Sequence, residues 1–286
     1  MSRMKCMLRW AGGKGRVLKY YEPLFPKQVD GRLLEPMCGG AALSFTWAPR
    51  FKGGLILGDA NAELMATYNW LKCDVEGVVD ALVELGDTYH DLEDETNRAI
   101  FYNSIKAAYN SLPYGQRVST PVRAAYFIFL NRTSFNGLYR VNRSGEYNTP
   151  FGKIKKLPDD LVSAVKTTAE IVSRPDVQLY ASTYEWVLQV ARPGDVVYFD
   201  PPFDGTFTAY TRAAFGSLEQ ACLRDTVDEL TEAGVAVFVA SSDTPLIREL
   251  YQEYAIFQLQ TPRSISCKGD DREPADELLI VNGVSC

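Results

Sequence analysis

Histidine and paired cysteines are nearly missing from this chain of 286 residues. It has one histidine, His90, and its six cysteines include no Cys-x-x-Cys pair. Zinc sites are built mostly from these two residue types, so the sequence argues against a metal site, and we expect reduced thiols. No segment approaches the roughly 18 apolar residues of a membrane span, and the N-terminus has no apolar signal segment. We therefore expect metal-free chemistry in the cytoplasm.

The chain also has no excess of positive charge, since its formal net charge is −6. Nucleic-acid binding depends on Lys and Arg, so this sum by itself argues against a nucleic-acid partner. The distribution is uneven, however: residues 1–32 hold eight basic residues against two acidic ones, residues 117–156 hold eight against one, and residues 74–95 hold nine acidic residues and no Lys or Arg. This segregation predicts a basic face suited to nucleic acid, although two solvated basic loops would give the same pattern.

The chain does contain an alternation of short apolar runs and helical segments. A hydrophobic content of 46% supports a substantial core, in one α/β domain or one domain with an insertion. Buried parallel strands read as continuous apolar runs. We expect a doubly wound, mostly parallel, Rossmann-like sheet of seven strands with the last strand inserted antiparallel. The strands are predicted at residues 32–35, 54–58, 177–180, 196–199, 235–240, 256–260 and 277–281.

The first predicted strand ends in a glycine turn at residues 35–43, and a short helix follows through Trp47. Glycine allows a ligand to approach the backbone closely, and a helix N-terminus favours polar or anionic groups. The second strand ends in Asp59, about twenty residues further on, where an acid suits a ribose diol. Asn61 is expected to cap the next helix. The pattern indicates a nucleotide-like ligand, and a purely structural turn fits it equally well.

Residues 131–156 differ in composition from the helical region before them, because they are rich in Asn, Gly, Arg and aromatic residues. Two glycine-centred turns, Asn136-Gly137 and Ser144-Gly145, are typical of a hairpin. Arg140 and Arg143, with tyrosines nearby, are suited to a nucleic-acid groove. A surface hairpin with ordinary polar tips is the alternative.

The most informative motif is Asp200-Pro201-Pro202-Phe203, which ends the apolar run at residues 196–199. Neither proline has a backbone donor and both fix φ, so a rigid loop leaves the sheet at the strand end where α/β sheets bind ligands. A carboxylate with neighbouring carbonyls can hold an exocyclic amine, and the ring of Phe203 can stack on its heterocycle. The motif indicates alkylation of a planar amine, or else an Asp that begins a Pro-Pro turn. Residues 204–216 follow as a loop expected to close over a substrate.

Taken in order, these pieces resemble the Dam family of DNA adenine-N6 methyltransferases over nearly the whole chain. The block from Asn131 to Gly152 is similar to the family's DNA-recognition hairpin and is the most specific match. The other matching motifs are Leu8-Arg9-Trp10-Ala11-Gly12-Gly13-Lys14, Leu33-Leu34-Glu35-Pro36, Gly58-Asp59-Ala60-Asn61, Asp243-Thr244-Pro245, Arg263-Ser264-Ile265-Ser266 and Asp276-Glu277-Leu278-Leu279.

The resemblance implies methyl transfer from S-adenosylmethionine to N6 of an adenine that has swung out of duplex DNA. It implies a methyltransferase domain, residues 1–72 and 157–286, and an inserted helical and β-hairpin DNA-recognition domain, residues 73–156. The catalytic residues would be Asp200, Pro201, Pro202 and Phe203. The cofactor-binding residues would be Trp10, Ala11, Gly12, Lys14, Glu35, Pro36, Gly39, Asp59 and Asp200. The DNA-binding residues would be Arg9, Asn131, Arg132, Phe135, Asn136, Leu138, Arg140, Asn142, Pro150 and Lys153.

Several of these positions also have a structural interpretation. Trp10 would serve equally as a core residue, Lys14 as a helix cap and Phe135 as packing for the hairpin. In the functional interpretation, Phe135 wedges into the duplex and Arg140 reads guanine through its paired donors, in the short palindrome GATC. We expect a cytoplasmic, DNA-associated monomer.

Three departures from the family pattern limit these assignments. Phe203 stands where close relatives usually have Tyr, which keeps the stacking face and loses a hydroxyl. In the glycine loop, Met37 and Cys38 replace bulkier or branched residues and Ala41 replaces a usual glycine, so cofactor affinity is the property most affected. The loop after Phe203 is also short, which would alter how a flipped base is enclosed. Rival interpretations are a cytosine-N4 methyltransferase, a protein-glutamine or RNA methyltransferase, and a DNA-binding module with a decayed methyl-transfer core.

Overall fold

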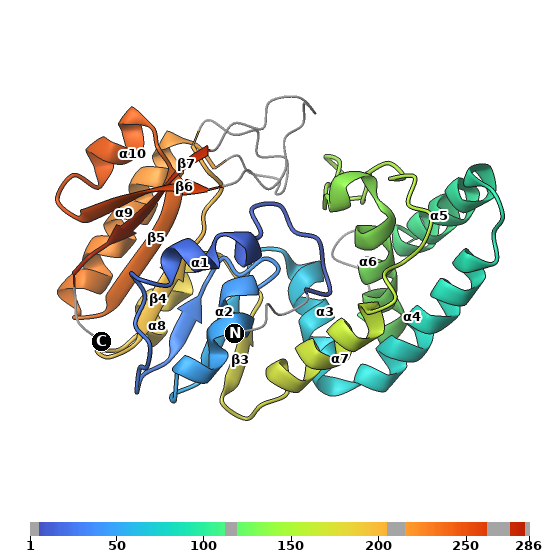
Figure 1. Ribbon diagram of the computed structural model, residues 1–286, viewed down its shortest axis with the longest axis horizontal. Coiled ribbons are helices and arrows are strands. Elements are labelled where there is room, and N and C mark those ends of the chain that lie inside the picture. Colours follow the sequence, from blue (N-terminus) through green and yellow to red (C-terminus); the bar gives the residue numbers. More distant parts are fainter. Residues whose placement is uncertain (1–5, 112–118, 205–214, 262–274, 284–286) are drawn as a thin grey trace.

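Seven strands form one sheet, flanked by helices, in the larger part of the molecule (Figure 1). The computed structural model describes residues 6–111, 119–204, 215–261 and 275–283. The strand order β3-β2-β1-β4-β5-β7-β6 reverses direction at β1, which confirms the predicted doubly wound sheet. The strands are β1 (Leu33–Glu35), β2 (Leu55–Gly58), β3 (Val177–Tyr180), β4 (Val196–Phe199), β5 (Ala236–Ser242), β6 (Ala255–Thr261) and β7 (Ala275–Val281).

The last strand in the sequence, β7, lies between β5 and β6 and runs antiparallel to both, as predicted. All other described pairs in the sheet are parallel. Because β7 runs in the opposite direction, its amino-terminal end lies at the edge where the parallel strands end. Glu277 pairs there with Ser242, the last residue of β5.

Ten α-helices are described, together with four short 3₁₀ turns. Asn61 caps α3 as predicted, because its side-chain oxygen accepts hydrogen bonds from the N–H groups of Glu63 and Leu64. The helices are α1 (Leu18–Tyr21), α2 (Ala42–Trp47), α3 (Ala62–Cys73), α4 (Val75–His90), α5 (Glu95–Tyr109), α6 (Pro121–Thr133), α7 (Leu161–Val172), α8 (Val187–Val190), α9 (Ser217–Glu232) and α10 (Pro245–Leu250). The 3₁₀ turns are η1 (Lys14–Arg16), η2 (Ala48–Arg50), η3 (Phe135–Gly137) and η4 (Tyr184–Trp186).

Both faces of the central strands β1, β2, β4 and β5 are buried, and successive residues of these strands enter different apolar clusters. Tyr198 of β4 packs with α1, α2 and α3, whereas Val197 and Phe199 pack with α8, α9 and α10. Continuous apolar runs are therefore required in these central strands, whereas the edge strands β3 and β6 also have exposed positions. Full burial of each such side chain stabilises the fold by about 1.5–3 kcal/mol.

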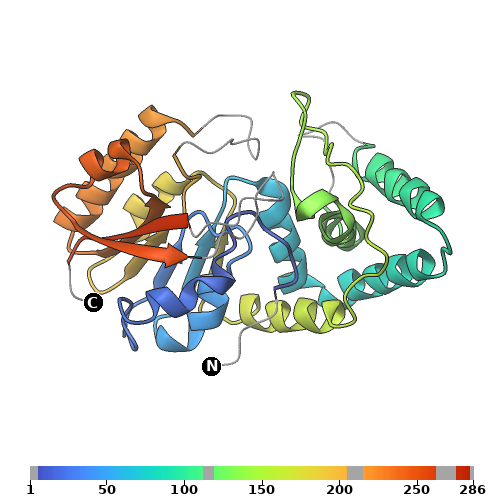
Figure 2. The ribbon, with the colours of Figure 1, turned by 45° about the horizontal axis from the view of Figure 1, so that its top comes forward.

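The inserted helices α4, α5 and α6 lie together beside α3 and α7, at the end of the molecule away from β6 (Figures 1 and 2). Their buried side chains, such as Tyr89, Tyr102 and Phe129, continue the apolar cluster that also contains Leu33 of β1. The inserted part and this side of the sheet thus share one core, and the domain boundaries at residues 72 and 157 stay a prediction.

The hairpin predicted for residues 131–156 is formed by isolated antiparallel bridges, Ser134 to Phe151 and Val141 to Tyr147, and not by two continuous strands. Asn131 and Arg132 belong to the last turn of α6, and the segment after them forms the turn η3 and isolated bridges, including Val141 to Tyr147. At the tip, the Asn142 side-chain oxygen accepts hydrogen bonds from the N–H groups of Ser144 and Glu146, which closes the turn between the two paired arms.

Two predicted loops lie largely outside the described residues. They are the segment 204–216, expected to close over a substrate, and the segment 263–274, which includes the Arg263-Ser264-Ile265-Ser266 motif. Within the part of the chain that is described, no helix has the length and apolar character needed to cross a membrane.

Candidate active site and nucleic-acid interface

Four carboxyl side chains meet at the carboxyl edge of the sheet. Glu35 ends β1, Asp59 follows β2 and Asp200 follows β4, and these three strands are neighbours in the parallel part of the sheet. Glu277 joins them because β7 runs in the opposite direction. The topology therefore places acids from four distant parts of the sequence at the edge where α/β folds bind ligands.

Asp200 is held by a buried lysine. The Nζ atom of Lys14, from η1, lies 2.8 Å from Oδ1 of Asp200 and 3.1 Å from Oε1 of Glu277. The same Nζ lies 4.5 Å from the centroid of the Phe203 ring, where a cation is attracted to the π face. Lys14, assigned to the cofactor from the sequence, thus contacts two residues of the catalytic motif.

The ionisation of this cluster follows from burial and charge. Burial raises the pKa of Asp200 to about 6, with Lys14 acting against the rise and Glu277 adding to it. For Lys14, burial by itself would lower the pKa, but the negative charges of Asp200 and Glu277 outweigh it and the pKa is raised. Above a pH of about 6 the Asp200 carboxylate is ionised beside a charged lysine, a state suited to accepting hydrogen bonds from an amine.

The backbone of the candidate catalytic motif and of the residue after it is held by side chains from α9 and from residues at and just after the end of β5. The amide of Gln220, on α9, donates a hydrogen bond of 3.0 Å to the Pro202 carbonyl. Ser242 and Thr244 donate to the backbone carbonyl and the side chain of Asp204. Gln220 is 1% exposed, and a buried amide aimed at a strand-end loop is a signal that only its place in the fold reveals.

The glycine turn after β1 is shaped by Asp59 and Trp10. The Asp59 carboxylate accepts hydrogen bonds from the N–H groups of Gly39, at 2.9 Å, and Asn61, at 2.8 Å. Gly39 has φ +47°, and a Cβ there would lie 2.4 Å from the indole of Trp10. A side chain at Gly39 is thus excluded by both conformation and space. Asp59, predicted to bind a ribose diol, orders the loop that such a ligand would approach.

Glu35 and Pro36 are buried at the start of this turn. Ser44 donates from its hydroxyl group and its backbone N–H to the Glu35 carboxyl group. Burial raises the pKa of Glu35 to about 8, so this carboxyl group is mostly protonated at neutral pH. Ala41, the departure from the family pattern, has φ +48° immediately before α2. The chain keeps the left-handed conformation there although the residue is not glycine.

Trp10 connects the glycine turn to the inserted region. Its ring stacks against Phe127 of α6 at 6.3 Å and against Tyr139 at 6.1 Å between centroids. The neighbouring Ala11 and Gly12 form a turn at the surface, with φ +74° at Gly12. One aromatic side chain therefore contacts both the candidate cofactor loop and the candidate DNA-recognition segment.

Some of the predicted DNA-binding residues are exposed at the surface, and others are half-buried or buried. Arg9, Phe135, Arg140, Pro150 and Lys153 are exposed, with Phe135 at 50%. Asn136, Leu138 and Asn142 are half-buried, as is Arg132, whose guanidinium donates to the backbone of Cys6. Asn131 is 2% exposed, so its place is inside the structure and not on a binding surface.

The exposed residues are presented in fixed positions. The Arg140 Nε donates at 2.8 Å to the Asn148 side chain, and its Nη2 donates at 3.2 Å to the Asn148 carbonyl. Phe135 is anchored through its N–H, which donates to the Pro150 carbonyl at 2.9 Å. Lys153 pairs with Glu95 at 2.9 Å, at the surface. The surface thus offers a guanidinium with limited freedom and an exposed aromatic ring.

Basic residues counted along the sequence are not all available to a nucleic acid. Arg123 forms a two-pronged pair with Glu63, with Nε and Nη2 at 3.0 and 2.9 Å from the two carboxylate oxygens. Lys14 is buried in the Asp200 cluster, and Arg32 pairs with Asp195 at the opposite edge of the sheet. Three of the predicted basic side chains therefore stabilise the fold.

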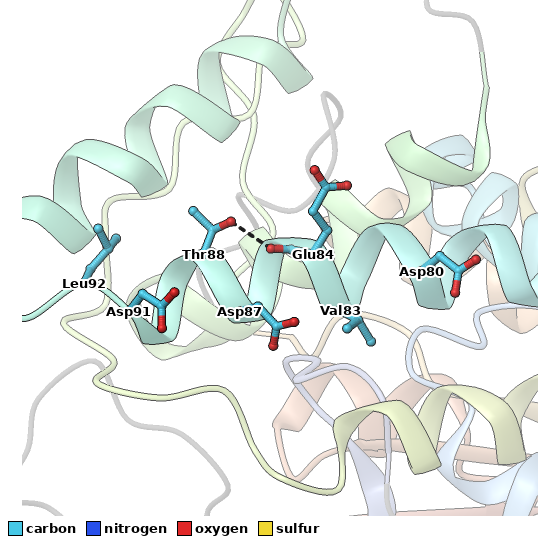
Figure 3. Close-up of a pocket in the computed structure, with 7 residues that line it drawn as sticks. All are labelled: Asp80, Val83, Glu84, Asp87, Thr88, Asp91 and Leu92. Carbon is cyan, nitrogen blue, oxygen red and sulfur yellow. Dashed lines mark hydrogen bonds between the residues drawn. The ribbon is translucent and has the colours of Figure 1, made fainter.

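A separate hollow of about 660 Å³ lies on the exposed face of α4, away from the Asp200 cluster (Figure 3). Carboxylates dominate its lining, and their negative charge would repel the phosphates of a nucleic acid. The described residues include no group of three or more His, Cys, Asp or Glu side chains that could hold a metal ion. The hollow is lined by Asp80, Val83, Glu84, Asp87, Thr88, Asp91 and Leu92.

Comparison of the sequence with known proteins shows which families and proteins this chain resembles. Residues 10–265 match the family model of the D12 class N6 adenine-specific DNA methyltransferases. The chain is 33% identical to the DNA adenine methylase of Escherichia coli strain K12 over 98% of its own length and 96% of that protein. It is 32% identical to Type II methyltransferase M.MjaIII of Methanocaldococcus jannaschii, covering 98% and 99%, and 30% identical to Type II methyltransferase M1.LlaDCHI of Lactococcus lactis subsp. cremoris, covering 96% and 94%.

Proposed function

The chain belongs to the D12 class N6 adenine-specific DNA methyltransferases, and we propose that it transfers a methyl group from S-adenosylmethionine to adenine within GATC in duplex DNA. The family is adenine-specific and enzymatic, which disfavours the cytosine-N4 interpretation and the decayed module. The observation that supports this proposal most strongly is the Asp200 carboxylate, held by Lys14 at the end of β4 beside the glycine turn.

The residues at the sheet edge fit S-adenosylmethionine. Its sulfonium and amino groups are cationic and its ribose has two hydroxyl groups, and the edge offers the carboxyl groups of Asp59 and Asp200, with the buried and mostly neutral Glu35 beside them. The missing Cβ at Gly39 allows close approach to the backbone, and Trp10 lies against the same turn. These residues would hold the cofactor, which when bound supplies an electrophilic methyl group.

In the proposed reaction, Asp200 and the Pro201 carbonyl accept the two hydrogens of the adenine amine. This orients the nitrogen lone pair towards the methyl group, so that the transfer depends more on proximity than on a strong base. Phe203 would stack on the base, and the hydroxyl of a tyrosine is not needed for that contact. The amine would lose a proton after attack, and the Asp200 carboxylate, which accepts its hydrogen bond, is placed to receive that proton. Pro202 acts through its backbone, which Gln220 holds in place.

Duplex DNA would bind along the exposed side of residues 131–153. Arg140 would read guanine, Phe135 would fill the space left by the extruded adenine, and Arg9 and Lys153 would contact the duplex. The assignment of GATC rests on the resemblance of this segment to the Dam recognition region. We propose further that the enzyme acts as a monomer on DNA in the cytoplasm.

The test is methylation of short duplexes by the purified full chain with radiolabelled S-adenosylmethionine. A duplex with one GATC site should become labelled at N6 of adenine, and matched duplexes with GATT or GTTC should not. Asp200→Ala should abolish the labelling while DNA affinity changes by less than about twofold, because it removes the amine acceptor only. Label on every duplex would refute the GATC assignment, and an active Asp200→Ala variant would refute the role of Asp200.

A further inference from the structure

Glu277 lies outside the catalytic motif and comes from the end of the chain. It is buried, with its side chain 7% exposed, and its Oε1 lies 3.1 Å from the Nζ of Lys14. The hydroxyl group of Tyr21 donates to the same oxygen. The antiparallel insertion of β7 accounts for its place, since a parallel strand would direct this end of β7 to the opposite edge.

Lys14 is shared between Glu277 and Asp200. An ammonium group has three donors, and here two carboxylates and the ring of Phe203 surround it, at 2.8, 3.1 and 4.5 Å. Asp200 is the more open partner, because its side chain is 18% exposed and those of Lys14 and Glu277 are 6% and 7%. Glu277 therefore holds the inner side of the lysine, and Asp200 lies on the side that a substrate can reach.

We propose that Glu277 is a positioning residue for methyl transfer, which holds Lys14 from the β7 side so that Lys14 in turn fixes the Asp200 carboxylate for the target amine. This inference rests on the role proposed above for Asp200. Without the charge of Glu277, Lys14 has one anionic partner and pairs with Asp200 alone. The carboxylate is then a weaker acceptor for the amine, and the lysine has lost one of the contacts that fix its side chain.

The charged and titratable groups around Asp200 determine the expected pH effect. They are Lys14 from η1, Tyr21 from α1, Glu35 from β1, Tyr198 from β4 and Glu277 from β7. Burial is the main reason that the pKa of Asp200 is raised, Lys14 opposes the rise and Glu277 contributes to it. Removal of the Glu277 charge should therefore lower the pKa of Asp200.

Glu277→Gln tests the proposal because it keeps the shape of the side chain and an acceptor oxygen for Lys14 and Tyr21. The expected result is a fall in kcat for duplex methylation of about tenfold, with KM for DNA within about twofold of wild type. The acid limb of the kcat profile should also move to lower pH. Glu277→Asp, which keeps the charge, should leave the limb in place. Glu232→Gln, at the exposed end of α9, is the matched control and should change neither quantity.

A second measurement does not depend on activity. Titration of the Asp200 carboxyl carbon by NMR in the full chain should give a lower pKa in Glu277→Gln than in the wild type. An equal pKa, an unchanged kcat, or a fall in kcat with an unmoved acid limb would each overturn the role of Glu277. Tyr21→Phe provides a further variant if Glu277→Gln does not fold, and it should change kcat in the same direction to a smaller extent.

The outcomes also separate this inference from the proposed function. An inactive wild type, or an active Asp200→Ala, would refute the proposed function. An active wild type, an inactive Asp200→Ala and a Glu277→Gln variant that behaves like wild type would refute the role of Glu277 alone.

Discussion

The side chain of Asn131 binds both backbone polar groups of Arg9. Arg9 N–H donates to Asn131 Oδ1 at 2.8 Å, and Asn131 Nδ2 donates to the Arg9 carbonyl at 2.7 Å. The same Nδ2 donates to the Gly137 carbonyl at 2.9 Å. A buried amide at the end of α6 therefore joins the segment that leads to Trp10 and Lys14 to the turn that presents Phe135. Asn131 is buried and holds in place the segments that carry Arg9 and Phe135, two of the residues proposed to bind DNA.

Asn131→Ala should lower the free energy of unfolding by about 1–3 kcal/mol, because it removes the partner of the buried Gly137 carbonyl and of the partly buried backbone groups of Arg9. It should also reduce methylation at low DNA concentration by raising KM for DNA. Urea unfolding and steady-state kinetics provide the two measurements. Asn103→Ala, on the exposed face of α5, is the control and should change stability by less than about 0.5 kcal/mol. Equal stability of the two variants would contradict the prediction.

Arg140→Ala should relax sequence specificity more than it slows turnover. The guanidinium is exposed and oriented by Asn148, and a paired contact with guanine contributes about 1–3 kcal/mol of discrimination. The ratio of kcat/KM between GATC and AATC duplexes should fall by roughly 5- to 150-fold. Arg192→Ala, an exposed arginine just before β4 at the other edge of the sheet, should leave that ratio unchanged. If Arg140→Ala keeps the same preference, the recognition segment is assigned wrongly.

Ala41 has a left-handed backbone conformation, so that different substitutions at this position should change the stability by different amounts. Ala41→Val should destabilise the protein by about 2 kcal/mol or more, because a β-branched residue with positive φ is strained and the site is buried. Ala41→Gly should be close to neutral: relief of about 1–2 kcal/mol of strain is offset by one lost buried methyl group and the greater backbone entropy of glycine, each about 0.5–1 kcal/mol. Chemical denaturation of both variants checks this order, and a Val variant as stable as wild type would contradict it.

Glu35 should make the protein less stable as the pH rises, whereas an ion-paired carboxylate makes a protein less stable as the pH falls. Its pKa is about 8 in the folded protein and near the ordinary 4.5 when unfolded, because burial disfavours the charge. The folded state binds the proton more tightly, so the contribution of Glu35 is intact below pH 4.5 and is lost as pH rises through about 8. Glu35→Gln, which stays neutral, should exceed wild type in unfolding free energy by roughly 2 kcal/mol or more at pH 9. The difference should disappear near pH 5, and a difference that is the same at both pH values would show that the charge is not responsible.

The sequence by itself determined the seven strands, because burial on both faces requires apolar runs that can be read directly, as at residues 196–199. It also determined the reaction class, because Asp200-Pro201-Pro202-Phe203 and the block from Asn131 to Gly152 are local motifs whose residues stand together in the chain. The antiparallel position of β7 was predicted as well. In the recognition segment the sequence predicted the hairpin but placed its start too early, since Asn131 and Arg132 belong to the last turn of α6 and the pairing is limited to isolated bridges.

The tertiary structure decided which side chains act together. Lys14, Asp200 and Glu277 are separated by many residues, and no local pattern shows that one lysine is shared by two carboxylates. In the same way, the sequence marks Asn131 as a polar residue of the recognition segment, and only its burial at the end of α6 shows that its amide is used to hold Arg9. Pairings of this kind depend on distances between residues that are far apart in the sequence. The hydrophobic pattern determines where strands and helices form, but it does not determine which polar atoms come together when those elements pack.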